Sequence, residues 1–176
     1  MRGGGPQREV HQVIRVQIRD LIGKPGTMRE QAISHTLESD LGTDVIAVRS
    51  GDPLEIELRL ESVHEGILAT AEVSAIAKGE CSRCLEQVEF EVQADFQELY
   101  HYQPEGEDDL PVELDAIELE QPLIDAVVLS LPIKPLCSES CGGICAGCGE
   151  RLEEDEAHDH QGPVDPRFDA LKDFGS

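Results

Sequence analysis

The sequence predicts an α+β protein: an antiparallel β-sheet meander packed by one main helix, with a Cys-rich, zinc-binding C-terminal segment. Three observations predict this class. Several short segments alternate apolar and polar residues, one later segment carries an apolar stripe at helical spacing, and the six cysteines fall into three close pairs. A length of 176 residues suits one domain with a small appendix.

The composition limits what the core can contain and where the protein can reside. Hydrophobic residues make up 39% of the chain, aromatic residues only 3%, and tryptophan is absent, so the core must rest on valine, isoleucine and leucine. No apolar run approaches the roughly 20 residues that span a bilayer. The segment Met1 to Val10 lacks the apolar stretch of a secretory signal. We therefore expect a cytoplasmic protein.

The first strand is predicted from Val10 to Arg19. Its apolar residues share one face and its polar residues the other, as in a half-buried strand; the apolar ones are Ile14, Val16 and Ile18. The run Gly23-Lys24-Pro25-Gly26 ends this strand. The next segment, Thr27 to Leu37, is polar, and both a short helix and an exposed loop fit it.

Further strands are predicted in close succession. The clearest runs from Leu54 to Leu60, where leucine and isoleucine alternate with charged residues. The others cover Asp44 to Arg49, Ile67 to Ala77 and Val88 to Gln93. Because short turns such as His64-Glu65-Gly66 separate these segments, antiparallel meander pairing is expected.

One helix is predicted after an acidic loop at Pro104 to Pro111. Pro122 suits its first turn, and Pro132 and Pro135 end it. Its apolar stripe should pack on the sheet; the stripe consists of Leu123, Ile124, Val127, Val128 and Leu131. We expect a disordered tail at 1–9, an α+β core domain at 10–135 and a Cys/His-rich zinc segment at 136–176, with a short final helix from Asp165 to Phe174.

The cysteines form the strongest motif in the chain. The pairs are Cys81 and Cys84, Cys137 and Cys141, and Cys145 and Cys148. Disulfides are disfavoured in a chain without a secretion signal, because cytosolic thiols stay reduced. A redox C-x-x-C site needs a βαβ context and surroundings that lower a thiol pKa, whereas the first pair lies between two strands in acidic surroundings. Zinc binding is the remaining interpretation of the cysteine pairs, since paired soft ligands of this spacing satisfy the tetrahedral coordination of zinc.

The division of ligands between zinc sites stays open. Six cysteines with His158 and His160 offer eight ligands, enough for two sites. One grouping joins Cys81, Cys84, Cys137 and Cys141, and leaves Cys145, Cys148, His158 and His160 for a second site that a short loop closes. The rival is a single ribbon-like site of Cys81, Cys84, Cys145 and Cys148. The two histidines also fit exposed loop residues. No H-E-x-x-H or other open catalytic zinc pattern is present, so we expect no enzymatic activity.

The charge points away from direct nucleic-acid binding. The net charge is −23, and no lysine or arginine occurs from Leu85 to Ile133. Phosphate binding needs clustered cations. The acidic stretch from Glu105 to Glu120 fits a solvated loop and helix start. It also fits a docking surface for a basic partner, because opposite potentials steer encounter. The residues proposed for docking are Glu105, Glu107, Asp108, Asp109, Glu113 and Asp115.

Taken in order, these motifs resemble the YceD family of bacterial proteins over roughly Val10 to Phe174. The resemblance is carried by Cys81-Ser82-Arg83-Cys84-Leu85, by Leu131-Pro132 at the helix end, by Pro135 to Gly149, and by Asp165-Pro166-Arg167. It implies a role in accumulation of large-subunit ribosomal RNA, and members of the family are often encoded beside L32, a small basic ribosomal protein. In some relatives two further cysteines stand where this chain has His158 and His160.

The function expected on this basis is that of a non-enzymatic ribosome-biogenesis factor. Its acidic surface would hold a basic ribosomal protein or a large-subunit assembly intermediate, and Zn²⁺, one ion or two, would be its cofactor. The alternatives are a zinc-knuckle RNA-binding protein, for which Arg83, Lys134 and Arg151 supply the nearby cations, and a C-x-x-C redox protein.

Overall fold

The computed structural model describes residues 14–145, 147–152 and 167, which form nine strands and one helix. The sheets have seven and two strands. The elements are β1 (Arg15–Gln17), β2 (Met28–Thr36), β3 (Leu41–Gly42), β4 (Ile46–Val48), β5 (Pro53–Ser62), β6 (Gly66–Glu80), β7 (Gln87–His101), β8 (Leu110–Pro111), β9 (Ala116–Glu118) and α1 (Glu120–Ser130).

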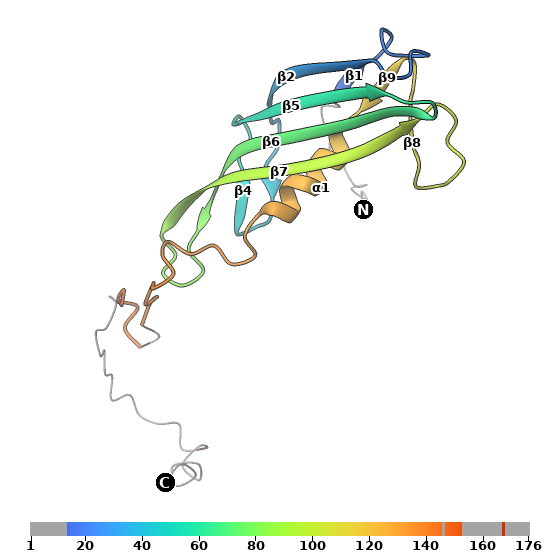
Figure 1. Cartoon of the computed structure of the whole chain (residues 1–176). Coiled ribbons are helices and arrows are strands. Elements are labelled where there is room, and N and C mark those ends of the chain that lie inside the picture. Colours follow the sequence, from blue (N-terminus) through green and yellow to red (C-terminus); the bar gives the residue numbers. More distant parts are fainter. Residues whose placement is uncertain (1–13, 146, 153–166, 168–176) are drawn as a thin grey trace, which may run out of the picture.

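The large sheet is built around a long hairpin. Strands β5, β6 and β7 form the antiparallel meander that the alternation predicts, and β2 adds outside β5. One edge of β6 is shared, because β5 pairs with residues 67–74 and β4 with residues 78–79. Strand β7 pairs with β6 over the whole length of both strands. The hairpin therefore runs past the end of β5 and projects toward the Cys-rich segment (Figure 1).

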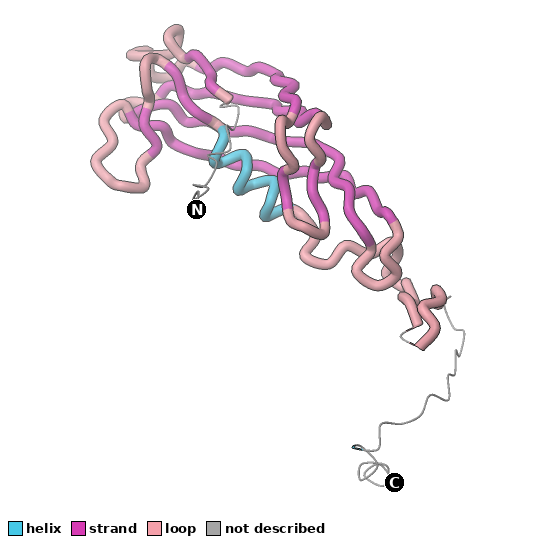
Figure 2. The backbone as a smooth tube through the Cα atoms, turned by 180° about the vertical axis from the view of Figure 1, so that it is seen from behind, coloured by secondary structure: helices cyan, strands magenta, loops and turns pink. Residues whose placement is uncertain are grey.

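The helix covers one face of this sheet and leaves the other open (Figure 2). Helix α1 contacts β7 and β3. The apolar stripe predicted for it is buried or half-buried, with Val127 fully inaccessible. On the facing side of β5, Leu54, Ile56, Leu58 and Leu60 are each at most 2% exposed, while the residues between them face solvent. The predicted α+β class with one main helix is confirmed.

Three local expectations need correction. Thr27 to Leu37 is neither helix nor loop, because β2 lies there and pairs antiparallel with β5. Its strand conformation depends on backbone pairing with a neighbour, and its inner face is only half-buried. The first strand does not join the meander, since β1 pairs with β9 in the small sheet. Strand β7 continues to His101, well beyond the predicted end at Gln93.

Some expectations concern parts of the chain without a described structure. The tail at 1–9 and, apart from Arg167, the helix from Asp165 to Phe174 lie outside the described residues. Among the residues that are described, no helix has the length and apolar character needed to cross a membrane.

Candidate metal centre and acidic surface

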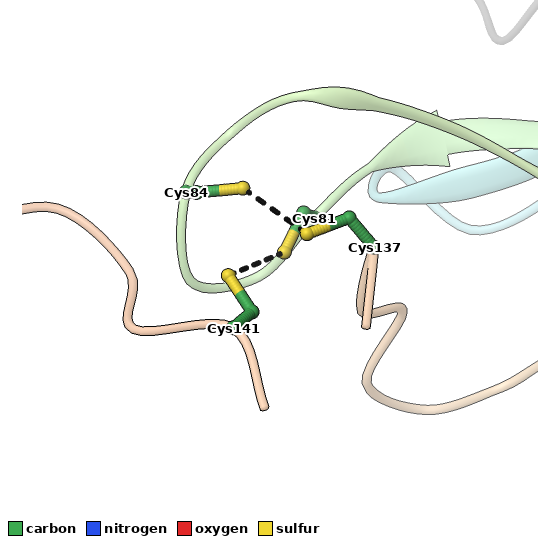
Figure 3. A group of neighbouring side chains, drawn as sticks. All are labelled: Cys81, Cys84, Cys137 and Cys141. Atoms are coloured by element: carbon green, nitrogen blue, oxygen red, sulfur yellow. Dashed lines mark hydrogen bonds between the residues drawn. The ribbon is translucent and has the colours of Figure 1, made fainter. Parts of the chain in front are cut away.

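Four cysteines from two distant segments meet at the tip of the β6–β7 hairpin (Figure 3). Cys81 and Cys84 lie in the loop between the two strands, and Cys137 and Cys141 follow α1. All four sulfur atoms lie within 4.8 Å of one another. The Cys84 and Cys137 sulfurs are 3.5 Å apart and those of Cys81 and Cys141 are 3.8 Å apart. All but Cys137 are buried.

Backbone hydrogen bonds hold the tip loop in place. The Cys81 N–H donates to the Glu86 carbonyl at 2.7 Å, and the Leu85 N–H donates to the Cys81 carbonyl at 2.9 Å. The loop closes with Leu85 in the left-handed region, at φ 60°. From the same loop, the Ser82 N–H donates to the Pro135 carbonyl at 2.8 Å. The chain that leaves α1 is therefore already joined to the tip beside the cysteines.

Arg83 connects the hairpin loop to the segment that follows α1. Its Nη1 donates to the carbonyl oxygens of Glu139 at 3.1 Å and Cys141 at 2.9 Å. Gly143 approaches the Arg83 backbone closely, because a Cβ there would lie 3.2 Å from the Arg83 carbonyl oxygen. Gly143 also has φ +85°, so glycine suits this position for two reasons.

Arg151 contacts both the hairpin loop and the cysteine group. Its Nη1 pairs with the Glu86 carboxylate, and its Nη2 lies 4.0 Å from the Cys137 sulfur. Sequence reasoning treated Arg83 and Arg151 only as possible RNA contacts and missed this role. The position of Arg83 inside the C-x-R-C motif was the available signal.

Hydrogen bonding divides the thiols into easily and poorly ionised ones. Burial acts to raise the pKa of the Cys81 thiol, but backbone N–H groups of Cys84, Cys137 and Arg83 outweigh it and lower the pKa to about 6. Hydrogen bonds with the Cys141 and Cys84 sulfurs raise the pKa of the Cys137 thiol to about 12. Since only thiolates bind zinc, a metal ion would displace the proton that the Cys137 thiol holds.

The geometry of the four sulfurs fits zinc. A tetrahedron with Zn–S bonds of about 2.3 Å has sulfur–sulfur edges of roughly 3.8 Å. Two sulfur pairs, at 3.5 and 3.8 Å, are close to that edge length, and every pair lies within 4.8 Å. A set of four cysteines is also a typical closed, structural zinc site. Cys81, Cys84, Cys137 and Cys141 could therefore hold a metal ion.

The remaining pair of cysteines lies in a separate turn. Ile144 and Arg151 pair as an antiparallel bridge, and between them the Gly149 N–H donates to the Cys145 carbonyl at 2.8 Å. The backbone N–H groups of Cys148 and Gly147 lower the pKa of the Cys145 thiol. The other two ligands suggested for a second site, His158 and His160, lie outside the described residues. In the described part of the chain, the cysteines grouped with Cys81 and Cys84 are Cys137 and Cys141, as in the first grouping and not as in the ribbon-like one.

The acidic loop proposed for docking contains residues with local roles. The Asp109 carboxylate accepts hydrogen bonds from the Glu105 and Gly106 N–H groups, each at 2.9 Å, and the Gly106 bond lowers the pKa of Asp109. Asp115 pairs with Arg19 at 3.2 Å. The exposed members of the predicted set are Glu105, Glu107, Asp108 and Glu113. Two of the six predicted docking residues therefore already have partners within the fold.

A larger acidic surface lies on the open face of the sheet. We call it the acidic face and define it by its exposed carboxylates on β2, β5, β6 and β7: Glu30, Glu55, Glu57, Glu72, Glu80, Glu89, Glu91 and Asp95. Glu57, Glu72 and Asp95 stand directly opposite one another across three strands. On the same strands the cations of this face are Arg59, which pairs with Glu61, and Lys78, which pairs with Asp52. Sequence reasoning missed this surface, because its residues come together only in the sheet.

Comparison with known proteins gives one family and several relatives. The family model of the large ribosomal RNA subunit accumulation protein YceD matches residues 69–175. A protein of Mycobacterium tuberculosis and one of Mycobacterium bovis, both named as uncharacterized, are each 39% identical to this chain over 180 residues, which is 97% of this chain and 86% of theirs. A similarly named protein of Mycobacterium leprae is 34% identical over 178 residues, or 96% of this chain and 80% of its own length. No solved structure matches the chain.

Proposed function

Because this chain belongs to the YceD family, we propose that it is a non-enzymatic ribosome-biogenesis factor that supports accumulation of large-subunit ribosomal RNA in the cytoplasm. The family description names that RNA. In this proposal the chain acts by binding a basic ribosomal protein, for which L32 is a candidate, either free or in a large-subunit assembly intermediate. The partner would then reach the RNA in a form competent for assembly.

The acidic face is the observation that carries this proposal. Carboxylates standing directly opposite across strands repel one another and destabilise a sheet. In this chain Glu57, Glu72 and Asp95 form such a row, and net charge of −23 adds to the repulsion. A lysine- and arginine-rich partner would neutralise the row, and its approach would be accelerated by the opposite potential. The exposed loop residues Glu105, Glu107 and Asp108 offer such a partner a second acidic stretch.

Zinc has a structural role in this proposal. Cys81, Cys84, Cys137 and Cys141 would hold it as a closed site. Bound there, the ion would crosslink the hairpin tip to the segment after α1. Arg83 and Arg151 assist, because their guanidinium groups bridge the same segments and bring positive charge to a centre of four thiolates.

The two other functions considered from the sequence receive less support from the geometry. RNA binding at the cysteines needs available cations. Of the three nearby ones, Arg83 donates to two carbonyls and Arg151 pairs with Glu86, which leaves the exposed Lys134. Contrary to the expectation from the acidic surroundings, the pKa of the Cys81 thiol is lowered to about 6, as a redox C-x-x-C site requires. Such a site also needs the two cysteines of one motif as its reacting pair, whereas the sulfur contacts of 3.5 and 3.8 Å join different segments.

The proposal is tested by measuring binding of purified basic large-subunit ribosomal proteins, L32 among them, at low salt. We expect the triple variant Glu57→Gln, Glu72→Gln, Asp95→Asn to bind at least tenfold more weakly than the parent. A charge-matched comparison variant removes three charges from the loop through Glu105→Gln, Glu107→Gln and Asp108→Asn. If it weakens binding more than the sheet variant does, the loop and not the acidic face is the docking surface. If no basic ribosomal protein binds the parent chain, but fragments of large-subunit RNA do so in a gel shift, the RNA-binding alternative replaces this proposal.

A further inference from the structure

The long strand β7 has one edge that is almost entirely unpaired. Its other edge pairs with β6 from Gln87 to His101. On the open edge, β8 pairs only with Tyr100 and His101. Within the described parts of the chain, no other segment forms backbone hydrogen bonds with residues 87–99 on that side. An unpaired edge of this length is a template on which an extended peptide can add as a further strand.

The backbone groups that face this open edge can be assigned from the hydrogen bonds at its two ends. At the tip, the Cys81 N–H donates to the Glu86 carbonyl, so that even-numbered residue points toward β6. At the other end, the Val112 N–H donates to the His101 carbonyl at 2.9 Å, so that odd-numbered residue points outward. Backbone direction alternates along an antiparallel strand. The N–H and C=O groups of the odd-numbered residues from Glu89 to Gln97 therefore face the open edge.

The side chains of the same residues decide which peptide fits. Glu89, Glu91 and Asp95 are exposed on the acidic face, and the residues between and beside them on this row are glutamines. A strand added to β7 would place every second side chain directly opposite this row. Lysine or arginine at those positions would meet carboxylates, whereas a second copy of this chain would oppose like charges. The edge is therefore protected against self-association and open to a basic strand.

The edge at the opposite side of the sheet lacks this selectivity. Strand β2 is also an edge strand, but on the open face it carries one acid, Glu30, whereas β7 carries three there. A basic peptide would therefore gain less from charge at β2 than at β7. Strand β2 thus provides an internal control for an effect of edge exposure alone.

We propose that β7 binds its partner by strand addition: an extended segment with lysine or arginine at alternate positions pairs with the open edge along Glu89 to Gln97. This inference rests on the proposed function, because it gives the basic partner a place and a conformation. Backbone hydrogen bonds would supply affinity that does not depend on sequence, and the row of carboxylates would select for cations.

The test uses the full chain and a labelled synthetic peptide of alternating lysine and valine. We expect binding that Gln93→Pro weakens about tenfold or more, because proline removes an outward N–H without disturbing the β6–β7 pairs or the charge. The matched control, Ala32→Pro, removes an N–H from the outer edge of β2 and should leave binding unchanged. The same peptide with alternate backbone nitrogens methylated keeps its charge but cannot pair, and should bind the parent at least tenfold more weakly. That comparison does not depend on how the variants fold.

Amide hydrogen exchange distinguishes strand addition from binding by charge alone. In the free protein the N–H groups of Glu91, Gln93 and Asp95 should exchange freely, and the peptide should protect them. Equal binding of the methylated and unmethylated peptides, or protection already present in the free protein, would overturn strand addition. If ribosomal proteins bind but neither Gln93→Pro nor methylation matters, the proposed function stands and this inference fails. If no basic protein or peptide binds, both fail.

Discussion

Replacing Cys84 by serine should loosen the tip of the β6–β7 hairpin and leave the main sheet folded. The two regions have separate apolar cores. Around the tip, Cys81, Cys84, Val88 and Cys141 form one small buried cluster. The core between the sheet and α1 is a different and much larger cluster. Serine offers no soft thiolate to zinc, so the variant should lose the metal-dependent part of the tip's stability.

The size of the effect follows from mass action and from the pairing of the hairpin. A metal ion present at about a thousand times its dissociation constant stabilises the bound state by roughly 4 kcal/mol, which corresponds to about a thousandfold in an opening equilibrium. Beyond residue 74, β6 has β7 along one side and β4 only at residues 78–79 along the other. A two-stranded ribbon is marginally stable in water. The outer half of the hairpin therefore has few other contacts that would keep it folded without the metal.

Amide hydrogen exchange on zinc-loaded protein measures the effect where it should occur. The Ser82 N–H, which donates to the Pro135 carbonyl, should exchange several hundredfold to a thousandfold faster in Cys84→Ser, and chelation of the parent should do the same. Amides of β5 should not change. Cys148→Ser, which removes a cysteine outside the four-sulfur group, is the matched control. Unchanged zinc content together with unchanged Ser82 exchange in Cys84→Ser would refute the reasoning.

Three further predictions concern the sheet. Tyr100→Phe should cost about 1–2 kcal/mol in urea unfolding, because the buried hydroxyl donates to the Glu118 carbonyl at 2.8 Å; no change would mean that water replaces this bond. Gly66→Ala should cost about 3 kcal/mol or prevent folding, since a Cβ there would run into the Tyr100 carbonyl, and a normal melting temperature would contradict this. Asp109→Asn should destabilise at neutral pH. The Asp109 pKa is lowered in the folded chain, so its contribution is full above its ordinary value of 3.8 and disappears as the pH falls through the lowered pKa; a stability difference that persists in acid would exclude this account.

The parts of the fold that sequence reasoning found are those with a strong local pattern. The alternation from Leu54 to Leu60 reflects a strand with one face fully buried and the other in solvent. The stripe in α1 reflects one buried face of a helix. Thr27 to Leu37 carries no such pattern, because β2 is an edge strand whose inner side is half-covered and accepts arginine, glutamine and histidine. Its conformation is set by β5 and not by its own residues.

The same distinction applies to the candidate metal centre. The spacing of the cysteines within each pair is local and was visible in the sequence, whereas the choice of Cys137 and Cys141 as neighbours of Cys81 and Cys84 depends on where α1 delivers the chain. The contacts of Arg83 and Arg151 depend on the same approach. The acidic face could not be predicted from the sequence for a similar reason. Glu57, Glu72 and Asp95 are far apart in sequence, and only strand register makes them neighbours.

The β6–β7 hairpin links the candidate metal centre to the open edge of β7. Its tip carries Cys81 and Cys84, and the open edge of β7 begins only a few residues later, at Gln87. A strand added to that edge needs β7 to stay extended in its outer half, which is the part that the fold itself supports least. A metal ion that fastens the tip to the segment after α1 would hold this half in place. Zinc need not touch a partner to matter for binding, because its contribution would be to keep the edge of β7 in a conformation that a basic strand can join.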